Sequence, residues 1–135
     1  MSFALERKLI ETCFKAGMPA DAPIQYGNTA FQPPATGFYR MSIIGGGKSG
    51  LMALTGGSQR RHAGRVIDVS IFVPKDGGTA VLRERADFVE AALAHQSLSE
   101  GACRIVIGGA TLQEIGPAGD WYQGNVTVTF TRDIA

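Results

Sequence analysis

The stretch IIGGGKSG, residues 43–50, has the composition of a loop that binds phosphate. Its glycines satisfy the spacing G-x-G-x-x-G of a dinucleotide-binding loop, which also needs a helix directly afterwards and an acidic residue about 20 positions further on. The apolar segment that follows, LMALT, reaches Gly56 and Gly57 before a helix can form, and Asp68 lies inside an expected strand. The pattern therefore disfavours dinucleotide binding, since a parallel β-α-β connection needs about a dozen residues or more.

The same stretch also matches part of the nucleotide-binding P-loop, whose pattern is G-x-x-x-x-G-K-[ST]. The letters GKS at 47–49 supply the second half of that pattern, but Ser42 stands where the first glycine is required. No helix follows whose N-terminus could hold the anion. We therefore interpret the stretch as the start of a glycine-rich hairpin connection, with Lys48 as an interface charge rather than a phosphate ligand. The sequence predicts no cofactor.

Residues that could hold a metal or catalyse a reaction do not cluster. His62 and His95 are far apart and have no cysteines or carboxylates at ligand spacing. Glu84, Asp87 and Glu90 share a helix face with arginines, which is typical of solvated charges with local pairing. The sequence also lacks a G-x-S-x-G nucleophile motif. It predicts no catalytic residue, no metal ligand and no enzymatic activity.

The two cysteines, Cys13 and Cys103, have apolar neighbours and match no metal or redox motif. This environment favours buried, reduced thiols. The spacing leaves a single disulfide open as the alternative.

Basic residues are the remaining candidates for a function. No Asp or Glu occurs from Met41 to Ile67. The basic residues and histidine of this segment are Lys48, Arg60, Arg61, His62 and Arg65. A basic loop can contact phosphate or an acidic protein surface, or it can be an ordinary solvated loop. Because a long connection without its own structure is usually functional or disordered, we take these five residues as candidates for an assembly interface.

The chain has the size and composition of one globular domain, residues 1–135. Its net charge is +1, which gives no general attraction to nucleic acid or to a membrane surface. No stretch approaches the run of about 18 apolar residues that a membrane-spanning helix needs. The charged start MSFALERKLIE lacks the apolar core of an export signal, so we expect the protein to be made and kept in the cytosol.

Hydrophobic periodicity predicts two amphipathic helices, over residues 3–16 and 79–95. Thr79 is placed to cap the second helix. The apolar stripe of this helix consists of Leu82, Ala86, Val89 and Leu93.

Alternating apolar residues predict strands over 38–44, 65–73, 103–107, 110–115 and 121–132, with a hairpin turn at Gly108-Gly109. We expect an α+β fold: a mostly antiparallel sheet of about four to six strands, both helices packed on one face, and a long Gly-rich connection. The other sheet face is rich in Ser and Thr, and it must meet water or a partner.

Taken together, the chain resembles the tail terminator-like proteins of long-tailed bacteriophages, prophages and gene transfer agents. The segments that carry the resemblance are the helix ALERKLIETCF, the proline-rich QYGNTAFQPP, the strand FYRMSII, the run RRHAGRVIDVSIFVPKDGG, the helix AVLRERADFVEAAL and the final GDWYQGNVTVTFTRD. They span nearly the whole chain. The family pattern contains no catalytic residues.

The resemblance implies a structural assembly protein of the virion tail. Such proteins form a hexameric ring at the tail–neck junction, cap the tail tube, stop its polymerisation and offer a docking surface for head joining. The implied partners are other copies of the chain, the tail tube protein and a neck or head-completion protein, with no membrane. Whether DNA passing through the ring lumen is a further partner is left open by the sequence. Before assembly, the implied location is the host cytoplasm.

Three other functions remain open at this point: another head–tail joining or minor tail protein, a nucleotide-binding enzyme that uses GGGKSG, and a generic host-encoded binding module unrelated to phage. For the assembly protein, we expect the tract Gly45–Gly64 to be mobile in the isolated subunit and to become ordered at a ring or tube contact.

Overall fold

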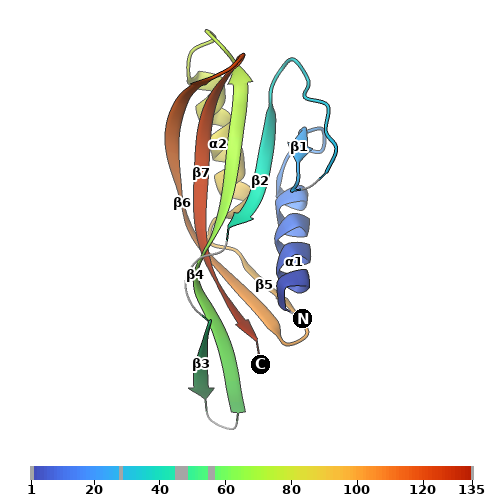
Figure 1. Cartoon of the computed structure of the whole chain (residues 1–135), viewed down its shortest axis with the longest axis vertical. Helices are drawn as coiled ribbons and strands as arrows, with labels where there is room; N and C mark the ends of the chain where they lie inside the picture. Colours follow the sequence, from blue (N-terminus) through green and yellow to red (C-terminus); the bar gives the residue numbers. More distant parts are fainter. Residues whose placement is uncertain (1, 28, 45–48, 55–56, 135) are drawn as a thin grey trace.

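The structure is a computed structural model that describes residues 2–27, 29–44, 49–54 and 57–134; at residues 2, 49–54, 57–63 and 134 it describes the backbone alone. Two helices, α1 (Ser2–Gly17) and α2 (Ala80–Leu93), lie beside one sheet. Both occupy the positions that periodicity predicts. The molecule is elongated, and both chain ends lie towards the same end of it (Figure 1).

The helices are held by apolar side chains at helical spacing. In α1, Ile10 and Phe14 are fully buried. In α2, the predicted stripe of four residues is buried, together with Ala92. Thr79 is the residue before α2, but its side chain makes no capping hydrogen bond, so the predicted cap is wrong in this respect. The first turn of α2 is therefore held by packing on the sheet rather than by a side-chain cap.

The sheet has a main path of six strands in the order β1-β2-β4-β7-β6-β5, and β3 pairs with β4 beside this path. Its strands are β1 (Ile24–Gln25), β2 (Phe38–Ile44), β3 (Ser49–Leu54), β4 (Gly57–Pro74), β5 (Ser97–Glu100), β6 (Cys103–Ala118) and β7 (Trp121–Ile134). Only the β1–β2 pair is parallel among the described strands; the other pairs are antiparallel. The expected α+β fold with a mostly antiparallel sheet is confirmed.

One predicted connection is wrong. Residues 103–107 and 110–115 are not the two arms of a hairpin, because β6 runs unbroken from Cys103 to Ala118. The pairs Ile107↔Phe130 and Ala110↔Val128 leave one extra residue on β6, so Gly108-Gly109 forms a β-bulge and not a turn. Glycine residues fit both a β-bulge and a turn, so only the pairing of β6 with β7 distinguishes the two.

The core lies between the helices and one face of the sheet. In Figure 1, α2 lies behind β4, β7 and β6 and covers their far side. Residues of these strands with fully buried side chains include Ile67, Val69, Ile71, Ile105 and Val128. They alternate with residues on the other face, most of them polar, such as Asp68, Arg104, Thr127 and Thr129, as a half-buried strand requires. The sheet thus has one covered face and one face that no described helix or strand covers.

Candidate assembly surface

The glycine-rich tract contains a β-hairpin that projects from one end of the molecule (Figure 1). We call the described part of this hairpin, residues 49–54 and 57–62, the arm. Its two strands pair from Ser49↔His62 to Leu54↔Gly57. Strand β4 therefore begins at Gly57, eight residues before the predicted start at Arg65 (65 − 57 = 8). The irregular part of the connection is shorter than expected.

The arm carries three of the five candidate interface residues. Arg60, Arg61 and His62 lie in β4, and their backbone pairs with β3 on one side and with the end of β7 on the other. Lys48 lies outside the described residues, as do Gly45, Gly46 and Gly47 of the GGGKSG stretch. Beyond that gap the chain continues as strand β3 and not as a helix, so the structural context of a phosphate-binding loop is missing at residues 49–54.

A β-bulge marks the base of the arm. The pairs His62↔Arg132 and Arg65↔Phe130 leave one extra residue on β4. Gly64 has a φ of +70°, a left-handed conformation that favours glycine. The bulge of β6 also adjoins Phe130, on the opposite side of β7. Two bulges therefore flank one residue of the central strand, and bulges increase the local bend and twist of a sheet.

Arg65, the fifth candidate, is turned into the protein. Its side chain is 8% exposed and donates two hydrogen bonds to Glu6 of α1, from Nε to Oε1 at 2.5 Å and from Nη2 to Oε2 at 2.9 Å. Arg132 of β7, which is fully buried, donates from Nη1 to the same Oε1 at 2.9 Å. Glu6 thus joins the first helix to both strands at the base of the arm.

Aromatic rings enclose this charge cluster. The guanidinium groups of Arg65 and Arg132 lie 5.6 Å and 4.8 Å from the centre of the Phe3 ring, and that of Arg65 lies 5.8 Å from the Phe130 ring. Such cation–π contacts add stabilisation when water is excluded. The bidentate pairing also fixes the geometry of the guanidinium. This environment gives Arg65 a structural role at the base of the arm.

The position of Glu6 in the sequence is a signal for this cluster. Glu6 stands four and eight residues before Ile10 and Phe14, and therefore on the buried side of α1. A carboxylate in line with core residues indicates a buried partner, but its spacing cannot identify Arg65 or Arg132.

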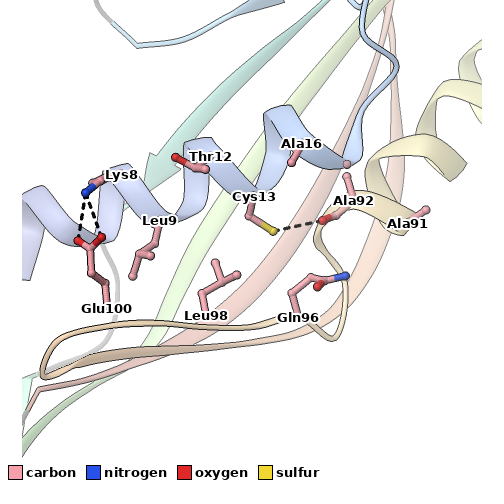
Figure 2. A pocket seen from close by; sticks show the side chains of 11 residues that line it. Lys8, Leu9, Thr12, Cys13, Ala16, Ala91, Ala92, Gln96, Leu98 and Glu100 are labelled. Atoms are coloured by element: carbon pink, nitrogen blue, oxygen red, sulfur yellow. Dashed lines mark hydrogen bonds and ion pairs between the residues drawn. The ribbon is translucent and has the colours of Figure 1, made fainter.

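A groove of about 440 Å³ lies between α1, α2 and β5, as Figure 2 shows. Small residues such as Ala16, Gly17 and Ala92 leave this space. At one end Lys8 and Glu100 form an ion pair with Nζ 3.0 Å from Oε1, so their charges neutralise each other. The groove offers apolar contacts and no unpaired carboxylate or histidine.

The thiol of Cys13 donates a hydrogen bond to the carbonyl oxygen of Ala92 across this groove, at 3.4 Å. Both Cys13 and Cys103 are free thiols, so the alternative of a disulfide is not realised in this structure. Burial raises the pKa of each thiol, which favours the unreactive protonated form.

Among the described residues, no group of three or more His, Cys, Asp or Glu side chains is placed to hold a metal ion. None of the described helices has the length and apolar character needed to cross a membrane. Arg83 of α2 pairs with Glu114 of β6, and hydrogen bonds from Tyr122 and Arg83 lower the pKa of Glu114.

Comparison with known proteins shows the family of this chain. A family model described as phage tail terminator protein matches residues 1–130. The chain belongs to the phage tail terminator protein family. A phage tail terminator protein is a structural component of the virion tail and associates with other tail and head-joining proteins. The family is a family of structural proteins and is not known for enzymes.

Solved structures support the same fold for this tail terminator protein. Seven chains of solved structures match it. One of them has a TM-score of 0.66 at 21% sequence identity, over 100% of this chain and 96% of the other. At this identity the likeness shows the fold alone. No curated protein matches the sequence.

Proposed function

We propose that this protein forms a six-membered ring on the end of the finished tail tube, at the tail–neck junction. There it caps the tube, stops further polymerisation and provides the docking surface for a neck or head-completion protein. The observation that carries the proposal is the family match over residues 1–130. Before assembly the subunit resides in the host cytoplasm, and no step involves a membrane.

The arm is the proposed contact element of the subunit. A closed ring uses heterologous contacts, in which one surface of a subunit meets a different surface of the next. A hairpin that projects beyond the body can reach a neighbouring subunit or the tube. Arg60, Arg61 and His62 lie on this hairpin, with Lys48 before it. Arg65 supports them from inside by anchoring the base of the arm to Glu6.

A basic arm can contact either DNA in the ring lumen or an acidic protein partner. The two partners differ in salt dependence, because DNA binding releases counterions and weakens steeply as salt is raised. Binding of the ring to double-stranded DNA at several salt concentrations, with Arg60→Glu and Arg61→Glu as variants, tests the DNA contact. Equal, weak binding by the wild type and both variants would exclude the DNA contact.

The test of the function uses tail tubes that polymerise in the presence and absence of this protein. Electron microscopy should show shorter tubes with a ring at one end when the protein is present, and unlimited growth when it is absent. Light scattering of the free protein shows whether the ring forms before it meets the tube. If the protein binds while the tubes keep growing, it is another head–tail joining or minor tail protein.

A nucleotide-binding activity would be detected by a thermal shift with nucleotides and magnesium. We expect no saturable stabilisation, because β3 follows the glycine-rich stretch where a P-loop requires a helix.

A further inference from the structure

On the face of the sheet that points away from α2, Phe38, Phe72 and Ser70 are buried at one end, and the rest forms an open surface. Strand register aligns its side chains in rows that cross β2, β4, β7 and β6. The rows are Arg40–Ser70–Asn125–Gln113, Ser42–Asp68–Thr127–Thr111 and Ile44–Val66–Thr129, followed by Thr131–Val106. We call these residues the open face. No described helix or strand lies in front of it in Figure 1.

The open face is large enough to form a protein interface. Four strands about 4.8 Å apart and rows about 6.8 Å apart give a surface of roughly 500 Å². A stable interface buries about 800 Å² on each partner, so this face would supply more than half of it. Ile44 and Val106 are 47% and 42% exposed and contribute apolar area at its edges.

The open face carries charges of both signs. Arg40 and Arg104, which neighbours Val106 on the same strand face, are exposed cations, and Arg40 donates a hydrogen bond to the side chain of Gln25 at 3.2 Å. Asp68 is partly buried and accepts a hydrogen bond from the Thr127 hydroxyl at 3.5 Å, and Asp133 stands opposite Arg104 in the strand register. The row that contains Arg40 has no carboxylate, so an incoming surface meets a positive charge at that end of the face.

A second unpartnered surface lies on α2. Its inward stripe is buried on the sheet, yet Val81 and Phe88, seven positions apart on the opposite side, are 44% and 38% exposed. Glu84 lies between them on the same side of the helix. We call these three residues the outer stripe of α2. Such apolar residues on both sides of a helix are typical of one that packs between two layers.

The charge of the outer stripe is negative. The neighbouring arginines of α2 are already bound within the subunit: Arg83 pairs with Glu114, and Arg85 donates a hydrogen bond to the carbonyl oxygen of Thr36 at 2.9 Å. Glu84 and Asp87 have no ion pair within the described residues. The outer stripe is thus an acidic and apolar surface that complements the Arg40 end of the open face.

We propose that the outer stripe of α2 in one subunit packs on the open face of the next subunit around the ring. The contact rests on the proposed ring. It is heterologous, so repeating it around a rotation axis closes a ring. It also places Glu84 near Arg40 and covers Phe88 with the apolar and threonine groups of the open face.

The alternative of two open faces packed on each other fits less well. That arrangement would be two-fold symmetric, whereas a closed ring of more than two subunits needs a heterologous contact. Sheets that pack face to face also need interdigitating apolar rows, whereas the central row here consists of Ser42, Asp68, Thr127 and Thr111.

Complementary variants test this contact. Phe88→Glu damages the outer stripe, and Thr129→Glu damages the open face, while Ala4→Glu places the same carboxylate on an exposed position of α1 as the control. We expect the wild type and the control to form rings, in solution or on tube ends. Each damaged variant alone should stay monomeric. An equal mixture of the two should form a one-to-one dimer, because one intact pair of surfaces remains.

Circular dichroism melting first establishes that each variant is folded. If Phe88→Glu unfolds, a photo-crosslinking phenylalanine at position 88 replaces it, with labelled and unlabelled copies mixed to identify contacts between subunits. Crosslinks to β2, β4, β7 or β6 of another copy support the proposal. Rings from folded Phe88→Glu or Thr129→Glu, or crosslinks elsewhere, would overturn this contact and leave the ring proposal intact. A wild type that forms no ring anywhere would overturn both.

Discussion

At the residue scale, Glu6 is the most connected charge described in this protein. It accepts hydrogen bonds from Arg65 and Arg132, which are 59 and 126 residues away in the sequence. Burial removes hydration from all three charges, and their mutual contacts compensate for it only while each partner is present. Removing the carboxylate therefore leaves two buried guanidinium groups facing each other.

We expect Glu6→Ala to lower the free energy of unfolding by about 3–5 kcal/mol, the usual cost of breaking a buried ion pair by removing one partner. Glu11→Ala is the matched control, because it removes a carboxylate from the same helix. Its surface pair with Arg7, at 3.2 Å, should be worth only about 0.3–0.5 kcal/mol. Urea denaturation of both variants gives the comparison, and equal losses would contradict a structural role for the cluster.

Titration of the Asp68 carboxyl group should make the free energy of unfolding depend on pH. Burial raises its pKa above the ordinary value near 3.8, although a hydrogen bond from Thr127 acts in the opposite direction. The folded protein therefore holds this proton more tightly than the unfolded chain. The resulting stabilisation is complete below the ordinary pKa and is lost as the pH rises through the raised value.

The Asp68→Asn variant removes this titration and keeps a group that can hydrogen-bond to Thr127. It should be more stable than the wild type at neutral pH, and the difference should shrink as the pH falls towards 3.8. Denaturation curves at several pH values measure it. A difference that grows on acidification would show that the carboxylate is favourably charged in the folded protein.

The residue roles were predictable only where they depend on local spacing. The buried positions Leu82, Val89 and Leu93 follow from the period of α2. Nothing in the run RRHAGR distinguishes Arg65 from the two arginines before it, because its partners come from the first helix and the last strand. Contacts between distant segments decide such roles, and spacing carries no information about them.

At the element scale, close approach of the two helices depends on a single glycine. A methyl group added to Gly17 would lie 2.7 Å from both Cα and Cβ of Ala92. The end of α1 therefore touches α2 nearly backbone to backbone. This contact also forms one end of the groove shown in Figure 2.

Gly17→Ala should consequently destabilise the protein by about 1–3 kcal/mol, the usual cost of overpacking. Gly27→Ala is the control, since an added methyl group there meets no atom within 4 Å. Thermal melting of the two variants separates packing from the general effect of replacing glycine. A Gly17→Ala variant as stable as the control would mean that the helices move apart at no cost.

The elements themselves were predictable to different degrees. Residues 38–44 match β2 because alternation and flanking glycine and proline define both ends. Strand β5 (Ser97–Glu100) and strand β3 were not predicted, since each is short and is stabilised by its partner strand. Gly108-Gly109 was interpreted as a turn because a bulge and a turn place the same demand on the backbone.

At the scale of the whole molecule, assembly should change the arm more than the body. Strand β3 pairs only with β4 among the described strands, and it lies away from the core. Segments with few buried contacts open at low free energy, so the amides of residues 49–54 should exchange quickly in the isolated subunit. A ring or tube contact would cover them.

Hydrogen exchange of the free and tube-bound protein measures this difference. We expect protection of 49–54 and 57–62 to rise on assembly, while the amides of β7, which pair on both sides, stay protected in both states. The expected mobility of the full Gly45–Gly64 tract includes residues outside the described part of the chain. Equally strong protection of the arm in both states would contradict ordering on assembly.

The position of β7 has a consequence for how the subunit is made. This strand follows every other described element in the chain, yet it lies in the middle of the sheet, between β4 and β6. Until β7 has been synthesised, the backbone edges of β4 and β6 that pair with it have no partner strand. Distant pairing of this kind slows folding and exposes the growing chain to aggregation. A supply of competent subunits therefore depends on completed translation, and a ribosome that stops before Trp121 releases a chain without the centre of its sheet.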